Sequence, residues 1–203
     1  GMVGTGNPGD GLGEFRHPYY VEIGPNGDIY VLDTDNFRIQ VFYPGNLSYK
    51  KTILSGVGGS ESDQVRWPCG FDLRNGKIVI ADTYNNRVQV LGEDGEYLFT
   101  IGYNGSTGSD EYHFFRPRKV DIDGEGNIWV ADANNNRVQV YSSNGSYLFS
   151  LGSAHGPPFD DNHLYEPSGV AVEYDKEEGE RKVYIVDIDN HRIQGYNTLG
   201  KKE

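Results

Sequence analysis

The chain has 203 residues and a formal net charge of −12; Gly (28) and Tyr (15) are frequent, whereas Met and Cys occur once each. This length suits one sizeable domain or two small ones, and much Gly with many aromatic residues is typical of strands joined by tight turns. The negative charge disfavours a phosphate backbone as partner.

No targeting signal is expected in this sequence. No apolar run approaches the ~20 residues that span a bilayer, and no charged and then apolar leader opens the chain. The single Cys69 has no partner for an internal disulfide. The localisation is therefore unknown, and the chain could be a fragment of a larger protein.

One motif, Asp-x-x-Asn-x-Arg followed by an alternating apolar segment, occurs four times. The copies begin at Asp33, Asp82, Asp132 and Asp187, and each follows a proline: Pro18, Pro68, Pro117 and Pro167. The last copy is longer by the charged stretch DKEEGERK, which we interpret as an insertion in a turn. A period of about fifty residues indicates a repeat architecture. We expect one domain over residues 1–203, with repeat units at approximately 13–56, 65–102, 115–152 and 164–203.

Apolar and polar residues alternate within each unit, as they do in half-buried strands. The second unit predicts strands over 70–73, 78–81, 87–90 and 97–101. Asn75-Gly76 and Asp94-Gly95 lie between them, and such pairs are strong hairpin signals because both residue types tolerate positive φ. Helix signals are absent. Four antiparallel strands per repeat predict an all-β fold, a β-propeller of four four-stranded blades.

The third unit resembles a known family. From Phe115-Arg116-Pro117 through Val140 it matches, almost position for position, the pattern G-x-F-x-x-P-x-x-V-x-I-D-x-x-G-x-I-Y-V-A-D-x-x-N-x-R-I-Q-V-F of the NHL repeat. All four units keep this register, so the resemblance covers nearly the whole chain. It implies a propeller, usually of six blades, that acts as an interaction module. Some members hold RNA, and related repeats occur in metal-dependent propeller lyases.

Four units are fewer than the usual six, which leaves three arrangements open. The last unit stops at 199–203, where a fourth strand should begin, and Met2-Val3-Gly4 resembles the end of such a strand. A closed four-bladed ring, an arc of a larger propeller and blades completed between chains all fit. Because a bare sheet edge invites pairing, we favour association, with a homo-oligomer formed through blade completion.

The repeated motif itself predicts a structural tie. Asp ends one strand, Asn takes the turn and Arg begins the next strand, so we expect a bidentate Arg–carboxylate pair in each blade. The five His residues show no metal-ligand spacing, and the sequence has no nucleophile elbow or phosphate-binding Gly loop. We therefore expect no catalytic residues, no metal and no cofactor.

Residues around the repeat prolines are the candidate binding site, because the inner strand begins there, near the channel mouth. Arg and aromatic residues anchor interfaces, and they gather at these positions in an acidic chain. The alternative is that the aromatics fill space between blades and each Arg pairs with a neighbouring Asp. The predicted binding residues are Arg16, His17, Tyr19, Arg66, Trp67, Phe115, Arg116, Arg118, Lys119 and Tyr165.

These observations favour a non-enzymatic interaction module, a scaffold that presents a basic and aromatic channel-mouth face to a peptide, protein or anionic ligand. Two alternatives remain open. One is a metal-dependent enzyme of the propeller lyase or lactonase kind, and the other is a purely structural assembly module. A protein or peptide is the expected partner, RNA is disfavoured by the net charge, and no membrane contact is expected.

Overall fold

The computed structural model describes residues 1–103, 105–153, 163–175 and 180–197. The strands of these residues form four antiparallel sheets in chain order, each of which is one blade; three sheets have four strands and the last has three. The strands are β1 (Pro18–Ile23), β2 (Ile29–Asp33), β3 (Arg38–Phe42) and β4 (Tyr49–Ile53); β5 (Gly70–Arg74), β6 (Lys77–Asp82), β7 (Arg87–Gly92) and β8 (Tyr97–Ile101); β9 (Pro117–Ile122), β10 (Ile128–Asp132), β11 (Arg137–Tyr141) and β12 (Tyr147–Gly152); and β13 (Pro167–Asp175), β14 (Glu180–Asp187) and β15 (Arg192–Tyr196).

The predicted all-β propeller is confirmed, and the second unit has its four strands where the alternation placed them. The turn that the sequence predicted within each motif is a short 3-10 helix: η1 (Thr34–Asn36), η2 (Thr83–Asn85), η3 (Ala133–Asn135) and η4 (Ile188–Asn190). Each turn lies inside the repeated motif, where Asn and Asp favour turns. No helix in the described part of the chain is long and apolar enough to cross a membrane.

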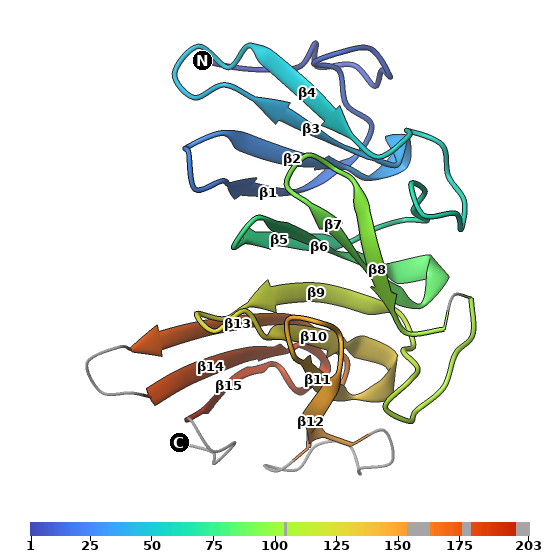
Figure 1. Ribbon diagram of the computed structural model, residues 1–203, viewed down its shortest axis with the longest axis vertical. Coiled ribbons are helices and arrows are strands. Elements are labelled where there is room, and N and C mark those ends of the chain that lie inside the picture. Colours follow the sequence, from blue (N-terminus) through green and yellow to red (C-terminus); the bar gives the residue numbers. More distant parts are fainter. Residues whose placement is uncertain (104, 154–162, 176–179, 198–203) are drawn as a thin grey trace.

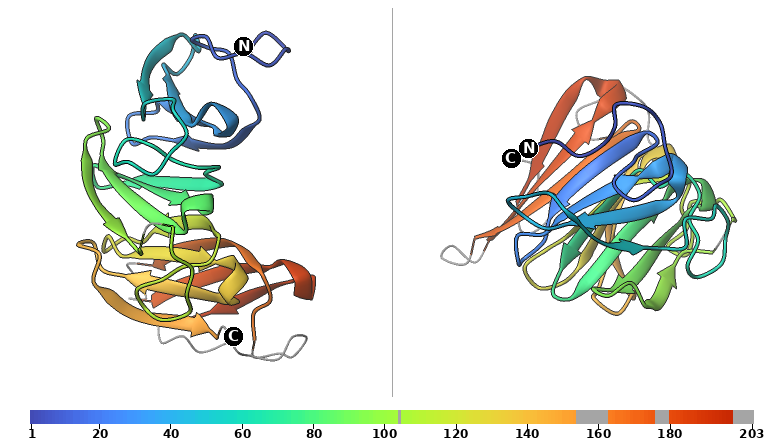
Figure 2. Two further views of the ribbon diagram at one scale, coloured as in Figure 1. Left: turned by 90° about the vertical axis from the view of Figure 1, so that its right-hand side faces the viewer. Right: turned by 90° about the horizontal axis from the view of Figure 1, so that it is seen from above.

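The four blades follow one another along a curved arc, with blade 1 at one end of the longest axis and blades 3 and 4 together at the other (Figure 1). Consecutive blades contact each other through their first strands, β1 with β5, β5 with β9 and β9 with β13. A side view shows the same curve (Figure 2). The described residues therefore form an open arc of blades.

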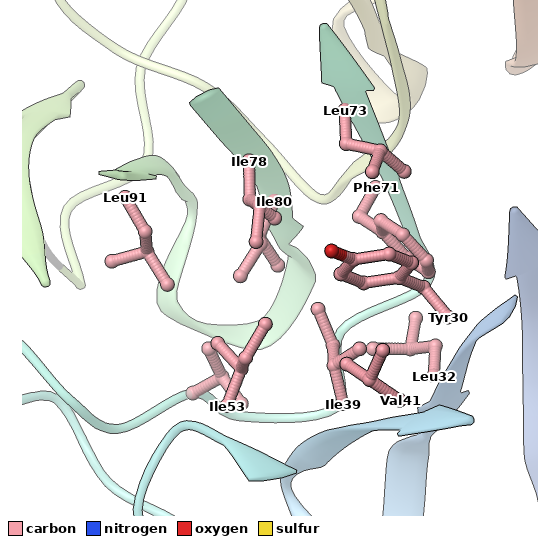
Figure 3. Close-up of a cluster of buried hydrophobic side chains, with 11 residues drawn as sticks. Tyr30, Leu32, Ile39, Val41, Ile53, Phe71, Leu73, Ile78, Ile80 and Leu91 are labelled. Carbon is pink, nitrogen blue, oxygen red and sulfur yellow. The ribbon is translucent and has the colours of Figure 1, made fainter. Parts of the chain in front are cut away.

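The hydrophobic core lies between consecutive blades. We call the blade face toward the next blade the forward face and the opposite one the rear face. The first of these interfaces (Figure 3) joins the forward face of blade 1, Tyr30, Leu32, Ile39 and Val41, to the rear face of blade 2, Phe71, Leu73, Ile78 and Ile80. Equivalent residues meet in the next two interfaces. Because strand residues alternate between faces, an inner blade buries both, and β10 (IWVAD) is buried throughout.

A buried ion pair anchors the turn of every blade, as the motif predicted. In blade 2, Asp82 Oδ2 accepts hydrogen bonds from Arg87 Nε (2.7 Å) and Asn85 Nδ2 (2.9 Å), and Asp82 Oδ1 accepts one from the Arg66 backbone N–H (2.7 Å). The other three blades repeat the Nε–Oδ2 contact at 2.8 to 2.9 Å. Burial raises the pKa of the equivalent Asp132 to about 6 even though its Arg partner stabilises the charge.

The Arg contact is not bidentate, contrary to the sequence prediction. Only Nε reaches the carboxylate, because Arg87 Nη1 and Nη2 donate to the backbone carbonyls of Ser60, Glu61 and Gln64 at 2.8 to 2.9 Å. These carbonyls belong to the loop that precedes the blade. The guanidinium therefore joins the turn to that loop as well as to the Asp.

The two chain ends were predicted to supply an outer strand together. Met2, Val3 and Gly4 lie outside any strand, so the N-terminal half of that prediction is not seen. Residues 199–203 fall outside the described residues, and the other half stays a prediction.

Replacing Asp132 with Ala is expected to destabilise the protein by about 3–5 kcal/mol, because it leaves a buried charge without its partner. The Asp132 side chain is fully buried and that of Arg137 is 8% exposed. Urea unfolding followed by the emission of the buried Trp129 measures the loss. In the matched control, Asp94→Ala, an exposed partner of Lys51 is removed, and the change should stay within about 0.5 kcal/mol. Similar losses for both variants would contradict the anchoring role.

Candidate binding site on the mouth face

The starts of the first strands and the 3-10 turns form one face of the arc, which we call the mouth face. It contains the residue before each repeat proline (His17, Trp67, Arg116 and Glu166) and the second residue of each turn (Asp35, Tyr84, Asn134 and Asp189). In every blade, the backbone N–H of the second turn residue donates to the carbonyl of the residue two positions before the proline; the Tyr84 N–H, for example, donates to the Arg66 carbonyl at 3.0 Å.

The residues before the prolines share an uncommon backbone conformation. All four have φ between 47° and 54°, in the left-handed region that residues with side chains rarely adopt. Because every blade keeps this conformation, it is a property of the fold and does not by itself mark a binding site.

Three side chains form a stack on the mouth face between blades 2 and 3. The rings of Trp67 and Tyr84 are 5.2 Å apart, and the guanidinium carbon of Arg116 lies 4.8 Å from the centre of the Tyr84 ring. Trp67 is 49% exposed and Tyr84 is 43% exposed. A cation over an exposed aromatic ring contributes about 0.5–1 kcal/mol of favourable interaction. This interaction holds the Arg116 and Tyr84 side chains in place, while the exposed parts of Trp67 and Tyr84 remain accessible to a ligand.

The stack borders a hollow of about 410 Å³ between blades 1 and 2. Trp67, Tyr84, Tyr19 and His17 line it, and His17 Nδ1 contacts the carboxylate of Asp35 there. The hollow thus combines aromatic surface with a polar pair at its edge. Such a site can hold an apolar side chain together with a neighbouring hydrogen-bonding group.

A second hollow, of about 480 Å³, lies on the inner side of the arc and shares Tyr19 with the first. Arg118 and Lys119 line this inner hollow, but both cations are engaged within the protein. Arg118 pairs with Glu166 at 2.9 Å, and Lys119 Nζ donates to the Phe71 carbonyl at 2.9 Å. Burial lowers the pKa of Lys119. The inner hollow is therefore less basic than the sequence suggested.

Two carboxylates on the first strands connect consecutive blades. Asp72 Oδ2 accepts a hydrogen bond from the Ile122 N–H at 2.7 Å, and Asp121 Oδ2 accepts one from the Val172 N–H at 2.5 Å. Burial, and then the charge of Asp72, raise the pKa of Asp121 to about 7. The first strand of a blade has one unpaired edge, and these carboxylates satisfy N–H groups on the edge of the next blade.

The structure brings six of the ten predicted binding residues to these features. Five line the hollows and Arg116 completes the stack: His17, Tyr19, Trp67, Arg116, Arg118 and Lys119. The residues two positions before the prolines line neither hollow: Arg16, Arg66, Phe115 and Tyr165. In all four, the backbone N–H donates to the repeated Asp, which gives the position a structural role. The part of all ten residues in binding stays a prediction.

The sequence prediction missed four residues that line the hollow between blades 1 and 2: Thr34, Asp35, Cys69 and Tyr84. Asp35 and Tyr84 occupy the second position of the turn, which was taken to be structural. A signal was present, because Tyr84 stands where the other copies have Asp or Asn.

The described residues contain no group of three His, Cys, Asp or Glu side chains that could hold a metal ion. The sequence-based expectation that the protein uses no metal stays a prediction.

The fold and the repeated ion pair define a β-propeller built from sequence repeats. The sequence matches the NHL repeat over residues 15–42, 66–91 and 114–141. The chain therefore belongs to the NHL-repeat family, as the resemblance implied. The fourth blade lies outside these matches but keeps the same ion pair and turn. A search of curated proteins returned no match.

Several solved structures share this fold. A streptogramin B lyase superposes with a TM-score of 0.62 at 15% identity over 90% of this chain. Hydrazine synthase of Kuenenia stuttgartiensis gives 0.57 at 13% over 95%, and an auxiliary nutrient binding protein of Bacteroides thetaiotaomicron gives 0.64 at 13% over 86%. The chain covers 52%, 51% and 46% of these proteins, about half of their lengths. At such identities the likeness shows the fold alone.

The Asp121→Asn variant should become more stable than the wild type as the pH rises. The pKa of Asp121 is about 7 in the folded protein, against about 3.9 in an unfolded chain. Protonated Asp121 therefore stabilises the folded state fully below about pH 4, and this stabilisation is lost as the pH rises through about 7. Asn retains an acceptor for Val172 and resembles the protonated acid.

Urea unfolding at several pH values between about 4 and 8 tests this expectation. The advantage of Asp121→Asn should grow by about 1 kcal/mol or more across that window. The control Asp94→Asn, at an exposed carboxylate, should show a nearly constant difference. A flat profile for Asp121→Asn would show that the carboxyl is ionised throughout.

Proposed function

We propose that this protein is a non-enzymatic binding module that recognises a peptide segment of a partner protein on its mouth face. The observation that carries the proposal is the exposed stack of Trp67, Tyr84 and Arg116 beside the hollow between blades 1 and 2. Trp, Tyr and Arg are the residue types most enriched among the residues that dominate binding energy at protein interfaces.

The chemistry of the site favours a peptide over other ligands. The rings of Trp67, Tyr84 and Tyr19 offer surface for apolar side chains, and Tyr19 is 64% exposed. A single exposed aromatic residue is common on protein surfaces, whereas a cluster of them indicates an interaction site. The Arg116 guanidinium over Tyr84 can also donate hydrogen bonds from its N–H groups to a carboxylate of the ligand. A peptide carrying an apolar and an acidic side chain would use both features.

RNA receives less support. The net charge is −12, and two of the cations near the mouth, Arg118 and Lys119, already bond to groups of the protein itself. Electrostatic binding of a phosphate backbone requires several cations that are not engaged elsewhere.

An enzymatic reading would assign acid–base chemistry to Asp72 and Asp121 on the inner side of the arc. Each of these carboxylates accepts a backbone N–H of the next blade, which supports a structural role. The solved structures of similar fold include two kinds of enzyme and a nutrient binding protein. Because one fold hosts many functions, these similarities do not decide between an enzyme and a binding module. The proposal therefore rests on the residues of the candidate site.

Selection from a phage-displayed library of random peptides on the 203-residue chain tests the proposal. Selected peptides should lose at least about ten-fold in affinity on Trp67→Ala or Arg116→Ala, since truncating an anchor costs more than ~1.4 kcal/mol. Tyr97→Ala is the matched control, because Tyr97 is equally exposed but lies on β8, and its effect should stay within about two-fold.

Tryptophan emission provides a second readout. The chain has two Trp residues, and Trp129 is buried, so a change in emission upon binding reports on Trp67. Selected peptides whose affinity ignores both alanine substitutions would place the site elsewhere. Failure to select any peptide, together with salt-dependent binding of single-stranded poly(U), would favour the RNA alternative.

A further inference from the structure

A further hollow lies between blades 2 and 3, against their outer strands β8 and β12. We call it the outer hollow; its volume is about 570 Å³, and it is lined by Glu111 and by the side chains of Tyr103, Tyr112, Tyr141 and Tyr147. We propose that the outer hollow binds an organic cation that carries a quaternary ammonium group. This site is separate from the mouth face, and the proposal does not depend on peptide binding there.

Two pairs of neighbouring rings line the outer hollow. The ring centres of Tyr103 and Tyr112 lie 6.4 Å apart with an interplanar angle of 52°, and those of Tyr141 and Tyr147 lie 5.8 Å apart at 74°. Tyr103, Tyr112 and Tyr147 are 59%, 57% and 39% exposed. Ring surface on both sides of the hollow therefore remains open to a ligand.

The fold does not require the aromatic side chains of Tyr103 and Tyr112. The Tyr103 N–H donates to the Tyr112 carbonyl at 3.2 Å, and the corresponding bond between blades 1 and 2 joins the Ser55 N–H to the Asp63 carbonyl at 3.0 Å. The same backbone bond is thus made where neither residue is aromatic. A cluster of exposed aromatic residues that the fold does not need indicates an interaction site.

A buried hydroxyl fixes the loop that carries Glu111 and Tyr112. Tyr141 Oη donates to the Glu111 carbonyl at 2.9 Å, and Tyr141 is 2% exposed. Blades 1 and 2 have Phe42 and Leu91 at this position, and neither side chain has a hydroxyl. Because the loop is held before a ligand arrives, binding costs less conformational entropy.

The charges around the outer hollow favour a cation. Glu111 brings a negative charge, and none of the described residues that line the hollow is Lys, Arg or His. The net charge of −12 attracts cations and repels anions at long range. A cation over the face of an aromatic ring is attracted by the negative face of the ring.

A quaternary ammonium group fits these residues better than a Lys ammonium or a sugar. The ammonium of Lys is compact and strongly hydrated, whereas aromatic rings are the usual partners of quaternary ammonium ligands. A neutral sugar depends on convergent hydrogen-bonding groups. The hydroxyls of Tyr141 and Tyr147 already donate within the protein, to the Glu111 carbonyl and to Ser150 Oγ.

Titration of the isotope-labelled 203-residue chain with choline, followed by NMR, tests the proposal. The amides of Glu111 and Tyr112 should shift and reach saturation. The matched ligand is the uncharged analogue of choline in which a tert-butyl group replaces the trimethylammonium group. It should bind at least about ten-fold more weakly, because it has the same shape without the charge.

Variants separate the ring from the hydroxyl. Tyr112→Ala should weaken choline binding at least about five-fold, whereas Tyr112→Phe should stay within about two-fold, because the ring makes the contact. Glu111→Gln should weaken the binding of choline and leave that of the uncharged analogue unchanged. Tyr43→Ala is the matched control, since Tyr43 is 46% exposed in the turn between β3 and β4, and should not change choline binding. Circular dichroism checks that the variants are folded.

A peptide that carries trimethyl-lysine distinguishes two sources of the group. Tighter binding of this peptide than of choline would assign the group to a protein side chain, and the reverse would assign it to a free cation; either result supports the proposal. Equal affinity for choline and its uncharged analogue would overturn it. Loss of binding in Tyr112→Phe, shifts centred on the mouth face, or no shifts at about 20 mM choline would overturn it as well.

Discussion

The buried carboxylate of the repeat motif is the interaction on which the rest of this structure depends. Asp82 Oδ1 accepts the backbone N–H of Arg66, which leads into the first strand of its blade, and Asp82 Oδ2 accepts Arg87 Nε and Asn85 Nδ2 after the turn. One side chain therefore fixes the start of the first strand relative to the turn. These two segments supply both sets of mouth-face residues, so the geometry of the candidate site follows from an ion pair that is itself fully buried.

The candidate site uses positions that the fold leaves free to vary. The second turn residue is held through its backbone, as Tyr84 is by the Arg66 carbonyl, and its side chain differs in every blade apart from the shared Asp of blades 1 and 4. Only blade 2 places a Tyr there, next to Trp67 of its own blade and Arg116 of the next. The recurring residues hold the fold together, and the residues of the candidate site stand where the repeats differ.

Much of the fold could be predicted from the sequence, because period and alternation are local signals; β8 (Tyr97–Ile101) has its predicted bounds. The site was predicted in part. Trp67 and Arg116 were named, whereas Tyr84 was missed because its stacking partners are brought together by the packing of two blades. The hydrogen bonds of Arg87 to loop carbonyls could not be predicted, because every residue has a backbone carbonyl and the sequence does not show which of them accept. Ile193 occupies the position at which Ile39, Val88 and Val138 are buried in the other blades. It is exposed because no blade covers this face of blade 4 in the described residues.

Mapping amide and indole chemical shifts by NMR tests the central claim most directly, that the mouth face is where this protein binds its partner. Upon addition of a library-selected peptide, the account predicts the largest shifts at the Trp67 indole N–H and the amides of Tyr84 and Arg116, with little change at the buried Trp129 indole. Largest shifts around Tyr103 and Tyr112, which line a separate hollow of about 570 Å³ beside β8, would contradict it.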